Sequence, residues 1–252
     1  MMTVLLTALG VGGASVFGIL MGFAFKKISH RFSDIVLSFA AGVMLAAAVV
    51  GLILPSLENE SPIALLVTVA GVFTGALCVN LFDKLAPHLH SLAGTEQEIH
   101  AEKQQQLNKV LLFVIAIAIH NLPEGLAAGV SLGLDDPGKA LTIAGGIALQ
   151  NIPESMVIVA PMLAVGMTKG RTLLIGILTG FVEVVGTLLG SLAVSVSAAI
   201  LPFALAFAGG TMLYVISDEM IPETHAHGSQ RGATYALLAG FCLMLAFDVL
   251  LG

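Results

Sequence analysis

Two related polar motifs, HNLPEG beginning at His120 and QNIPES beginning at Gln150, interrupt long apolar stretches of the sequence. An ionisable group at membrane depth is unfavourable and is by default a functional-site hypothesis. Helical residues four apart share a face, so each motif should place its first residue beside its glutamate, Glu124 or Glu154. Proline lacks an N–H and frees the backbone carbonyl four residues earlier, which loosens both helices. Imidazole, amide and carboxylate groups gathered in this way predict a metal-ion site.

A third acidic residue, Glu183, lies in the apolar stretch GFVEVVG. Lipid would not tolerate three separate carboxylates, so protons or a cation must neutralise them. The amides of Asn121 and Asn151 stand beside the motif glutamates and favour a cation. Polar side chains also hydrogen-bond membrane helices together, but that interpretation does not explain a repeated motif with a third buried acid. The candidate metal ligands are therefore His120, Asn121, Glu124, Gln150, Asn151, Glu154 and Glu183.

The elements that position these residues are predicted to be transmembrane helices. The chain of 252 residues is 57% hydrophobic and only 10% charged, whereas a soluble domain carries about 25% charged residues. A spanning helix needs roughly 20 apolar residues. Eight segments meet this requirement, at about 3–25, 33–55, 62–85, 108–133, 139–166, 171–195, 199–222 and 233–251. We therefore predict an all-α helix bundle that forms a single transmembrane domain over 1–252.

Basic residues predict how the helices are oriented, because cytoplasmic loops carry an excess of Lys and Arg. With the N-terminus outside, the opposite loops hold only Lys139. The cytoplasmic loops then hold Lys26, Lys27, Arg31, Lys84, Lys103, Lys109, Lys169, Arg171 and Arg231. Both termini are thus predicted to be extracytoplasmic. The first apolar run lacks a basic start and is too long for a signal peptide, so we expect a retained helix.

Several other features have ordinary explanations. Glycines at four-residue spacing, such as Gly125/Gly129 and Gly186/Gly190, predict closely packed helices. Cys78 and Cys242 lack a CxxC spacing and are expected to be small buried hydrophobes. The His-containing loop 86–107 is expected to be a solvated linker, with weak metal capture left open. Ten scattered basic residues argue against nucleic-acid binding.

The paired motifs, the acid in the following helix and the eight predicted spans resemble the ZIP family of divalent-metal transporters, in particular its prokaryotic GufA-like branch. The resemblance implies a binuclear centre bridged by Glu124 and Glu154. Its first site would be completed by His120 and Gln150, and its second site by Asn121, Asn151 and Glu183. Many relatives have histidine in place of Gln150, and some have aspartate in place of Asn151. Both differences leave this centre with weaker ligands.

The resemblance also implies a transport pathway through the bundle. Asp34 and Met44 resemble residues along the entrance side of the second helix. Glu58 and Asp248 lie at predicted outer helix ends, where they would attract cations or simply cap helices. The segment from 218 to 225 resembles the cytoplasmic exit of the family, with candidate ligands Asp218, Glu219, Glu223 and His225.

Taken with the residues, the resemblance implies import of Zn²⁺ across the cell (inner) membrane by alternating access, with protons displaced from the glutamates. Fe²⁺, Mn²⁺ and Cd²⁺ also suit carboxylate, amide and imidazole ligands. A metal-selective channel that uses the same site remains an alternative to the carrier. Separately, a homodimer in the bilayer remains open. An intramembrane metalloenzyme would need an HExxH-type pair, and HNLPE lacks the second histidine. A structural scaffold would not explain three buried acids.

Overall fold

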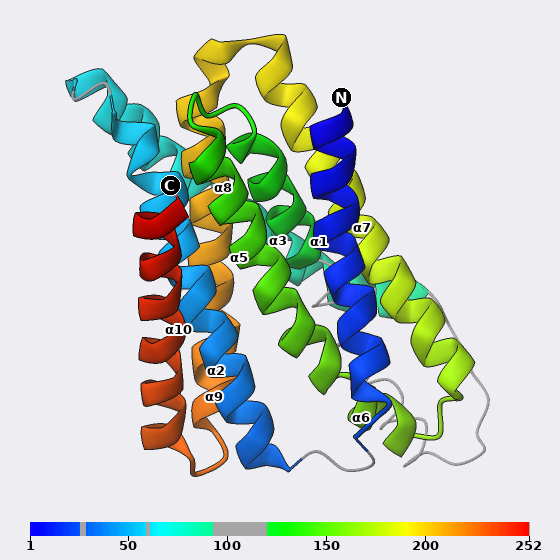
Figure 1. Cartoon of the computed structure of the whole chain (residues 1–252). Coiled ribbons are helices and arrows are strands. Elements are labelled where there is room, and N and C mark those ends of the chain that lie inside the picture. Colours follow the sequence, from blue (N-terminus) through cyan, green and yellow to red (C-terminus); the bar gives the residue numbers. More distant parts are fainter. Residues whose placement is uncertain (26–28, 59–60, 93–119, 252) are drawn as a thin grey trace.

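The computed structural model describes residues 1–25, 29–58, 61–92 and 120–251, and all of its long elements are helices (Figure 1). The helices are α1 (Met2–Gly22), α2 (His30–Ala46), α3 (Pro62–Leu92), an unlabelled helix over 120–131, α5 (Pro137–Val157), α6 (Val159–Ala164), α7 (Lys169–Val196), α8 (Leu201–Val215), α9 (Ile221–His225) and α10 (Gln230–Leu251). Shorter turns are η1 (Ala47–Ile53), η2 (Pro55–Leu57), η3 (Ala198–Ile200) and η4 (Ile216–Met220).

Seven helical segments within the described residues are long and apolar enough to cross a membrane. This confirms an all-α, multi-span architecture. The predicted span at 108–133 falls partly outside the described residues, and only its 120–131 part is seen as a helix. Both chain ends lie toward the same end of the bundle (Figure 1). The total of eight spans and the side that the termini face stay predictions.

Helix starts follow from local capping chemistry. Ser29 accepts a hydrogen bond from the backbone N–H of Phe32 at the start of α2, and Thr168 does the same for Arg171 at the start of α7. Asp136 caps α5 and is followed by a proline in the first helical position. This cap explains why α5 begins slightly earlier than the apolar pattern indicated.

Two spans contain a wider π-helical turn. α2 continues into η1, and α8 continues into η4 before α9 begins. π turns are rare and occur frequently at functional sites. The η4 turn carries Asp218 and Glu219, two of the candidate exit residues.

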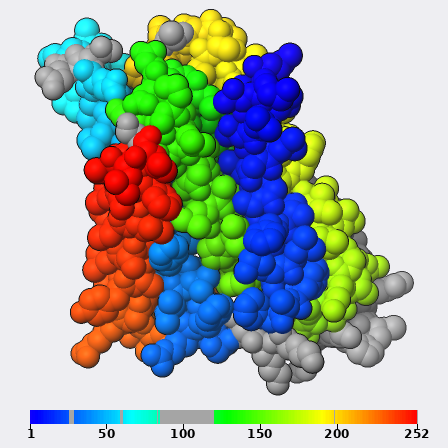
Figure 2. Space-filling model, viewed as in Figure 1, coloured from blue at the N-terminus to red at the C-terminus, as the bar shows by residue number. Residues whose placement is uncertain are grey.

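Small residues allow the helices near the motifs to pack backbone against backbone. A Cβ atom at Gly125 would overlap the carbonyl oxygen of Glu183, and one at Gly186 would lie 2.6 Å from the carbonyl oxygen of Leu122. The close helix packing expected from the glycine spacing is therefore present, and the structure shows that it joins the helix over 120–131 to α7. α1 packs on both α5 and α7, and α2 packs on α10. Figure 2 shows α1, α5 and α10 side by side on one face of the bundle.

Candidate metal site

Two consecutive residues of α5 hold the carboxylates of two neighbouring helices. Gln150 Nε2 donates to Glu124 Oε1 at 2.9 Å, and Asn151 Nδ2 donates to Glu183 Oε2 at 2.8 Å. Successive helical residues point in directions about 100° apart. α5 therefore reaches the helix over 120–131 with one amide and α7 with the next. The two motifs and the third acid are brought together, as expected.

The same pairing leaves three oxygen atoms without partners. Each amide uses its NH₂ group on a carboxylate, so Gln150 Oε1 and Asn151 Oδ1 remain as acceptors. Seven buried side-chain atoms of the described residues have no hydrogen-bond partner, and these two atoms and Glu124 Oε2 are the three of them at this site. Buried polar atoms without partners are uncommon and costly. An acceptor-only set of amide and carboxylate oxygens suits a cation.

Glu183 is fully buried and has donors on both carboxylate oxygens. Ser15 Oγ, from α1, donates to Glu183 Oε1 at 2.6 Å, opposite the bond from Asn151. Thr187 Oγ1 donates to the backbone carbonyl of Glu183 at 2.9 Å. None of the metal ligands predicted from the sequence lies on α1. The sequence feature that could have identified Ser15 is its position as a polar residue on the face of α1 that carries the small residues Gly12 and Gly18.

His120 and Glu154 face a cavity on the other side of the site. The cavity has a volume of about 460 Å³, and its lining includes Asp218, Glu219 and Glu223 from η4 and α9. His120 Nε2 lies 2.8 Å from Glu219 Oε1. Three of the four candidate exit residues therefore share one cavity with the first motif. Asn121 instead donates from Nδ2 to the backbone carbonyl of Thr179 at 3.1 Å.

No three His, Cys, Asp or Glu side chains within the described parts of the chain are already arranged to hold a metal ion. The carboxylates are held by amide and hydroxyl donors and by burial. Cation binding at this site would therefore exchange hydrogen bonds for metal–oxygen bonds.

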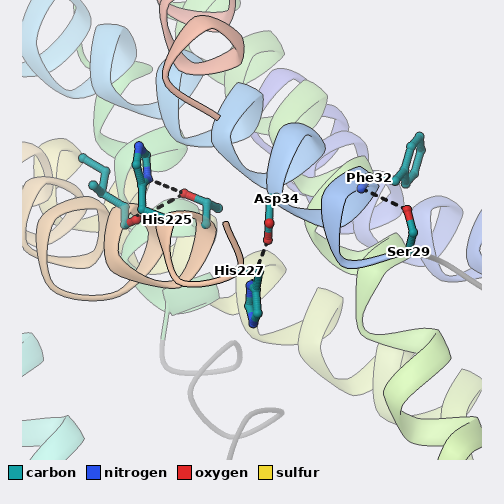
Figure 3. A network of polar contacts seen from close by, with 7 residues as sticks. Ser29, Phe32, Asp34, His225 and His227 are labelled. Atoms are coloured by element: carbon teal, nitrogen blue, oxygen red, sulfur yellow. Dashed lines mark hydrogen bonds and ion pairs between the residues drawn. The ribbon is translucent and has the colours of Figure 1, made fainter. Parts of the chain in front are cut away.

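The structure places Asp34 differently from the sequence expectation. Asp34 was expected on the entrance side of α2, but it lies four residues after the start of that helix, next to the loop that follows α9. Its Oδ1 atom is 3.1 Å from His227 Nδ1 (Figure 3). The ring of His30 stacks on that of His227, with the ring centroids 4.9 Å apart. At 1.5 Å per residue, Asp34 is roughly 36 Å along the helix from Glu58. Asp34 therefore belongs to the end of the bundle that carries the candidate exit.

The remaining pathway candidates lie in different surroundings. Met44 is fully buried in the apolar core, and Glu58 is exposed with Lys139 Nζ 3.7 Å from its Oε1 atom. Asp248 is partly buried near the C-terminal end of α10. His225 bonds within its own end of the bundle, with Nδ1 2.9 Å from the Ile221 carbonyl oxygen and Nε2 3.2 Å from Thr234 Oγ1 (Figure 3).

Comparisons with known proteins identify the family. The model of the family described as ZIP zinc transporter matches residues 83–248. The chain is 43% identical over 207 residues to the zinc transporter GufA of Myxococcus xanthus, covering 80% of each chain. It is 38% identical over 253 residues to the zinc transporter ZIPB of Bordetella bronchiseptica, covering 96% of this chain and 81% of the relative.

A third relative, the zinc transporter ZupT of Chlorobium chlorochromatii, is 30% identical over 240 residues, with 90% of this chain and 89% of the relative covered. These matches confirm the transporter class that the paired motifs indicated, and they rule out the intramembrane metalloenzyme. With its apolar helices, the chain is a multi-pass membrane protein. It belongs to the ZIP zinc transporter family.

Proposed function

We propose that this protein imports divalent cations, Zn²⁺ first, into the cytoplasm through the site between the helix over 120–131, α5 and α7. The observation that carries the proposal is the set of unpartnered oxygens, Glu124 Oε2, Gln150 Oε1 and Asn151 Oδ1, among buried carboxylates. The names of the three relatives, all zinc transporters, support Zn²⁺ as the substrate. Fe²⁺, Mn²⁺ and Cd²⁺ suit the same ligands.

Charge supports a centre that takes more than one cation or shares its charge with protons. Three ionised glutamates carry more negative charge than one divalent cation can neutralise. Two divalent cations would bring more positive charge than the three glutamates carry. Glu124 and Glu154 would bridge the two positions, with His120 and Gln150 at the first. Asn151 and Glu183, with Asn121 after it leaves Thr179, would form the second. Protons on the glutamates are the natural counter-charge of the empty site, because an uncompensated buried carboxylate is strongly unfavourable.

The shape of the surroundings favours alternating access over an open pore. His120 and Glu154 face the cavity that runs to Glu223. Toward Glu58, α2 and α5 pack through fully buried side chains such as Met44 and Ile147. A second cavity of about 460 Å³ lies at the opposite end of the helices and is lined by residues such as Leu132 and Ser191, but by no candidate ligand. Of these two cavities only the one beside His120 is lined by candidate ligands, which fits a carrier open at one end better than a channel with a continuous path. By the predicted orientation, the open end faces the cytoplasm, where the exit would be.

The test is uptake of radioactive zinc into proteoliposomes. Glu124→Ala and Glu154→Ala should abolish accumulation while the protein stays folded and inserted. Asp135→Asn, which changes an exposed loop acid, should accumulate zinc like the wild type. Equal uptake by all four proteins would show that the motifs serve helix packing, and the proposal would fail.

A further inference from the structure

The first helix contributes one hydroxyl group to the centre of the site. Ser15 is 1% exposed and Glu183 is 0% exposed, and the bond from Ser15 Oγ to Glu183 Oε1 is 2.6 Å long. A serine hydroxyl buried in an apolar helix can satisfy itself on its own backbone, as Ser131 does on the carbonyl of Ala128 at 2.9 Å. Ser15 instead crosses to a carboxylate on another helix.

The backbone of α1 is fixed on both sides of Ser15. A Cβ atom at Gly12 would lie 2.5 Å from the carbonyl oxygen of Gly180, and one at Gly18 would overlap the carbonyl oxygen of Ile152. Gly180 precedes Glu183 by one turn on α7, and Ile152 follows Asn151 on α5. α1 thus rests directly on the two helices whose side chains meet at Glu183, and its register leaves the Ser15 hydroxyl little freedom.

Two donors from different helices therefore set the plane of the Glu183 carboxylate. Ser15 holds Oε1 and Asn151 holds Oε2. A carboxylate oxygen has two lone pairs, so each oxygen keeps one lone pair for a cation while it accepts one hydrogen bond. Asn151 is itself a candidate ligand through Oδ1, whereas Ser15 is not and acts on Glu183 only as a hydrogen-bond donor. Ser15 would then be the donor that keeps Glu183 oriented.

We propose that Ser15 is a positioning residue that orients Glu183 for cation binding, an inference that rests on the proposed function of this site. Without its hydroxyl, Oε1 loses its donor inside an apolar environment, and the carboxylate must reorient before it meets a cation. Loss of this hydrogen bond to a charged carboxylate corresponds to roughly a tenfold weakening of zinc binding.

The experiment measures the zinc dissociation constant of the purified full-length protein by equilibrium dialysis with Zn²⁺ alone. Ser15→Ala should weaken binding by roughly tenfold, while Ser131→Ala, a buried serine that bonds its own helix, should bind as the wild type does. Loss of folded protein lowers the number of sites but not their affinity, so the two effects separate in one titration. An unchanged dissociation constant in Ser15→Ala would overturn the inference.

A double variant tests whether Ser15 acts through Glu183. If it does, adding Ser15→Ala to Glu183→Gln should weaken zinc binding no further than Glu183→Gln alone. Effects that multiply would show that Ser15 acts elsewhere, which also overturns the inference. The proposed function is tested separately, because it is rejected only if Glu124→Ala retains zinc uptake. Lost uptake in Glu124→Ala with wild-type affinity in Ser15→Ala would reject the role of Ser15 alone.

Discussion

Replacing Gly125 by alanine should impair transport by pushing two site helices apart. A Cβ atom at this position would lie 2.9 Å from both the Cα and carbonyl carbon of Glu183, and closer still to the carbonyl oxygen. Ordinary contacts begin near 3.4 Å, so the helix over 120–131 and α7 must separate by at least about 0.5 Å. Every obstructing atom is backbone, so no side-chain rotation relieves the overlap.

The magnitude follows from where this separation occurs. Glu124 precedes Gly125 directly, and Glu183 carries the obstructing carbonyl, so the added methyl group displaces two candidate ligands from each other. Overpacking of this kind costs about 1–3 kcal/mol of stability, and a misplacement approaching 1 Å lowers activity by up to about 10²-fold. We expect Gly125→Ala to insert and fold with a lower melting temperature and to take up zinc at roughly a tenth to a hundredth of the wild-type rate.

Gly145→Ala is the matched control for this substitution. Gly145 lies on α5, a helix of the same site, but a Cβ atom there meets nothing within 4 Å. Because alanine is a better helix former than glycine by about 1 kcal/mol, this variant should transport normally and melt at the same or a higher temperature. Wild-type uptake in Gly125→Ala, or an equal loss in Gly145→Ala, would refute the reasoning from close helix packing.

Three further predictions concern the surroundings of the site. Glu219→Gln removes the carboxylate next to His120 at the cavity and should slow zinc release. In proteoliposomes the maximal uptake rate should therefore fall more than the half-saturating zinc concentration changes. The reverse pattern would argue against an exit role for Glu219. Lys139→Ala breaks an exposed pair with Glu58 that is worth at most about 1 kcal/mol, so zinc uptake and the melting temperature should stay close to wild type, and a large loss would point to a gate at that end. Protons and cations compete for the same carboxylate oxygens, so zinc affinity measured by dialysis should fall steadily from about pH 7.5 to about pH 5.5, and a flat profile would contradict proton displacement.

Much of the site was predictable because its residues repeat at helical spacing in apolar sequence. The two motifs placed Glu124 and Glu154 at the centre, and the rarity of acids in such stretches singled out Glu183. Glycine spacing predicted closely packed helices, although it did not indicate that the backbone of Glu183 would lie against Gly125. These signals are local, or they depend on the cost of burying charge, so a single sequence carries them.

The remaining features depend on contacts between distant segments. Ser15 and Glu183 are 168 residues apart in sequence, and the pair of Asp34 with His227 is 193 residues apart. The sequence around a lone serine in a helix, or around an aspartate near a helix end, does not indicate which distant residue the side chain will contact. The bond from Asn121 to the Thr179 carbonyl, in place of a carboxylate, depends on side-chain orientation. The π turn that carries Glu219 is followed by Pro222, but a proline indicates a disturbed helix without specifying a π turn.

The most direct test of the central claim is X-ray absorption at the zinc edge of the zinc-loaded protein, wild type beside Glu124→Ala. A zinc site built on Glu124 and its neighbours predicts a first shell made only of oxygen and nitrogen, at about 2.0–2.2 Å. It also predicts a lower coordination number or lost occupancy in the variant. A sulfur ligand at about 2.3 Å would place zinc on a cysteine or methionine side chain instead. A first shell identical in both proteins would likewise contradict a cation site built on Glu124.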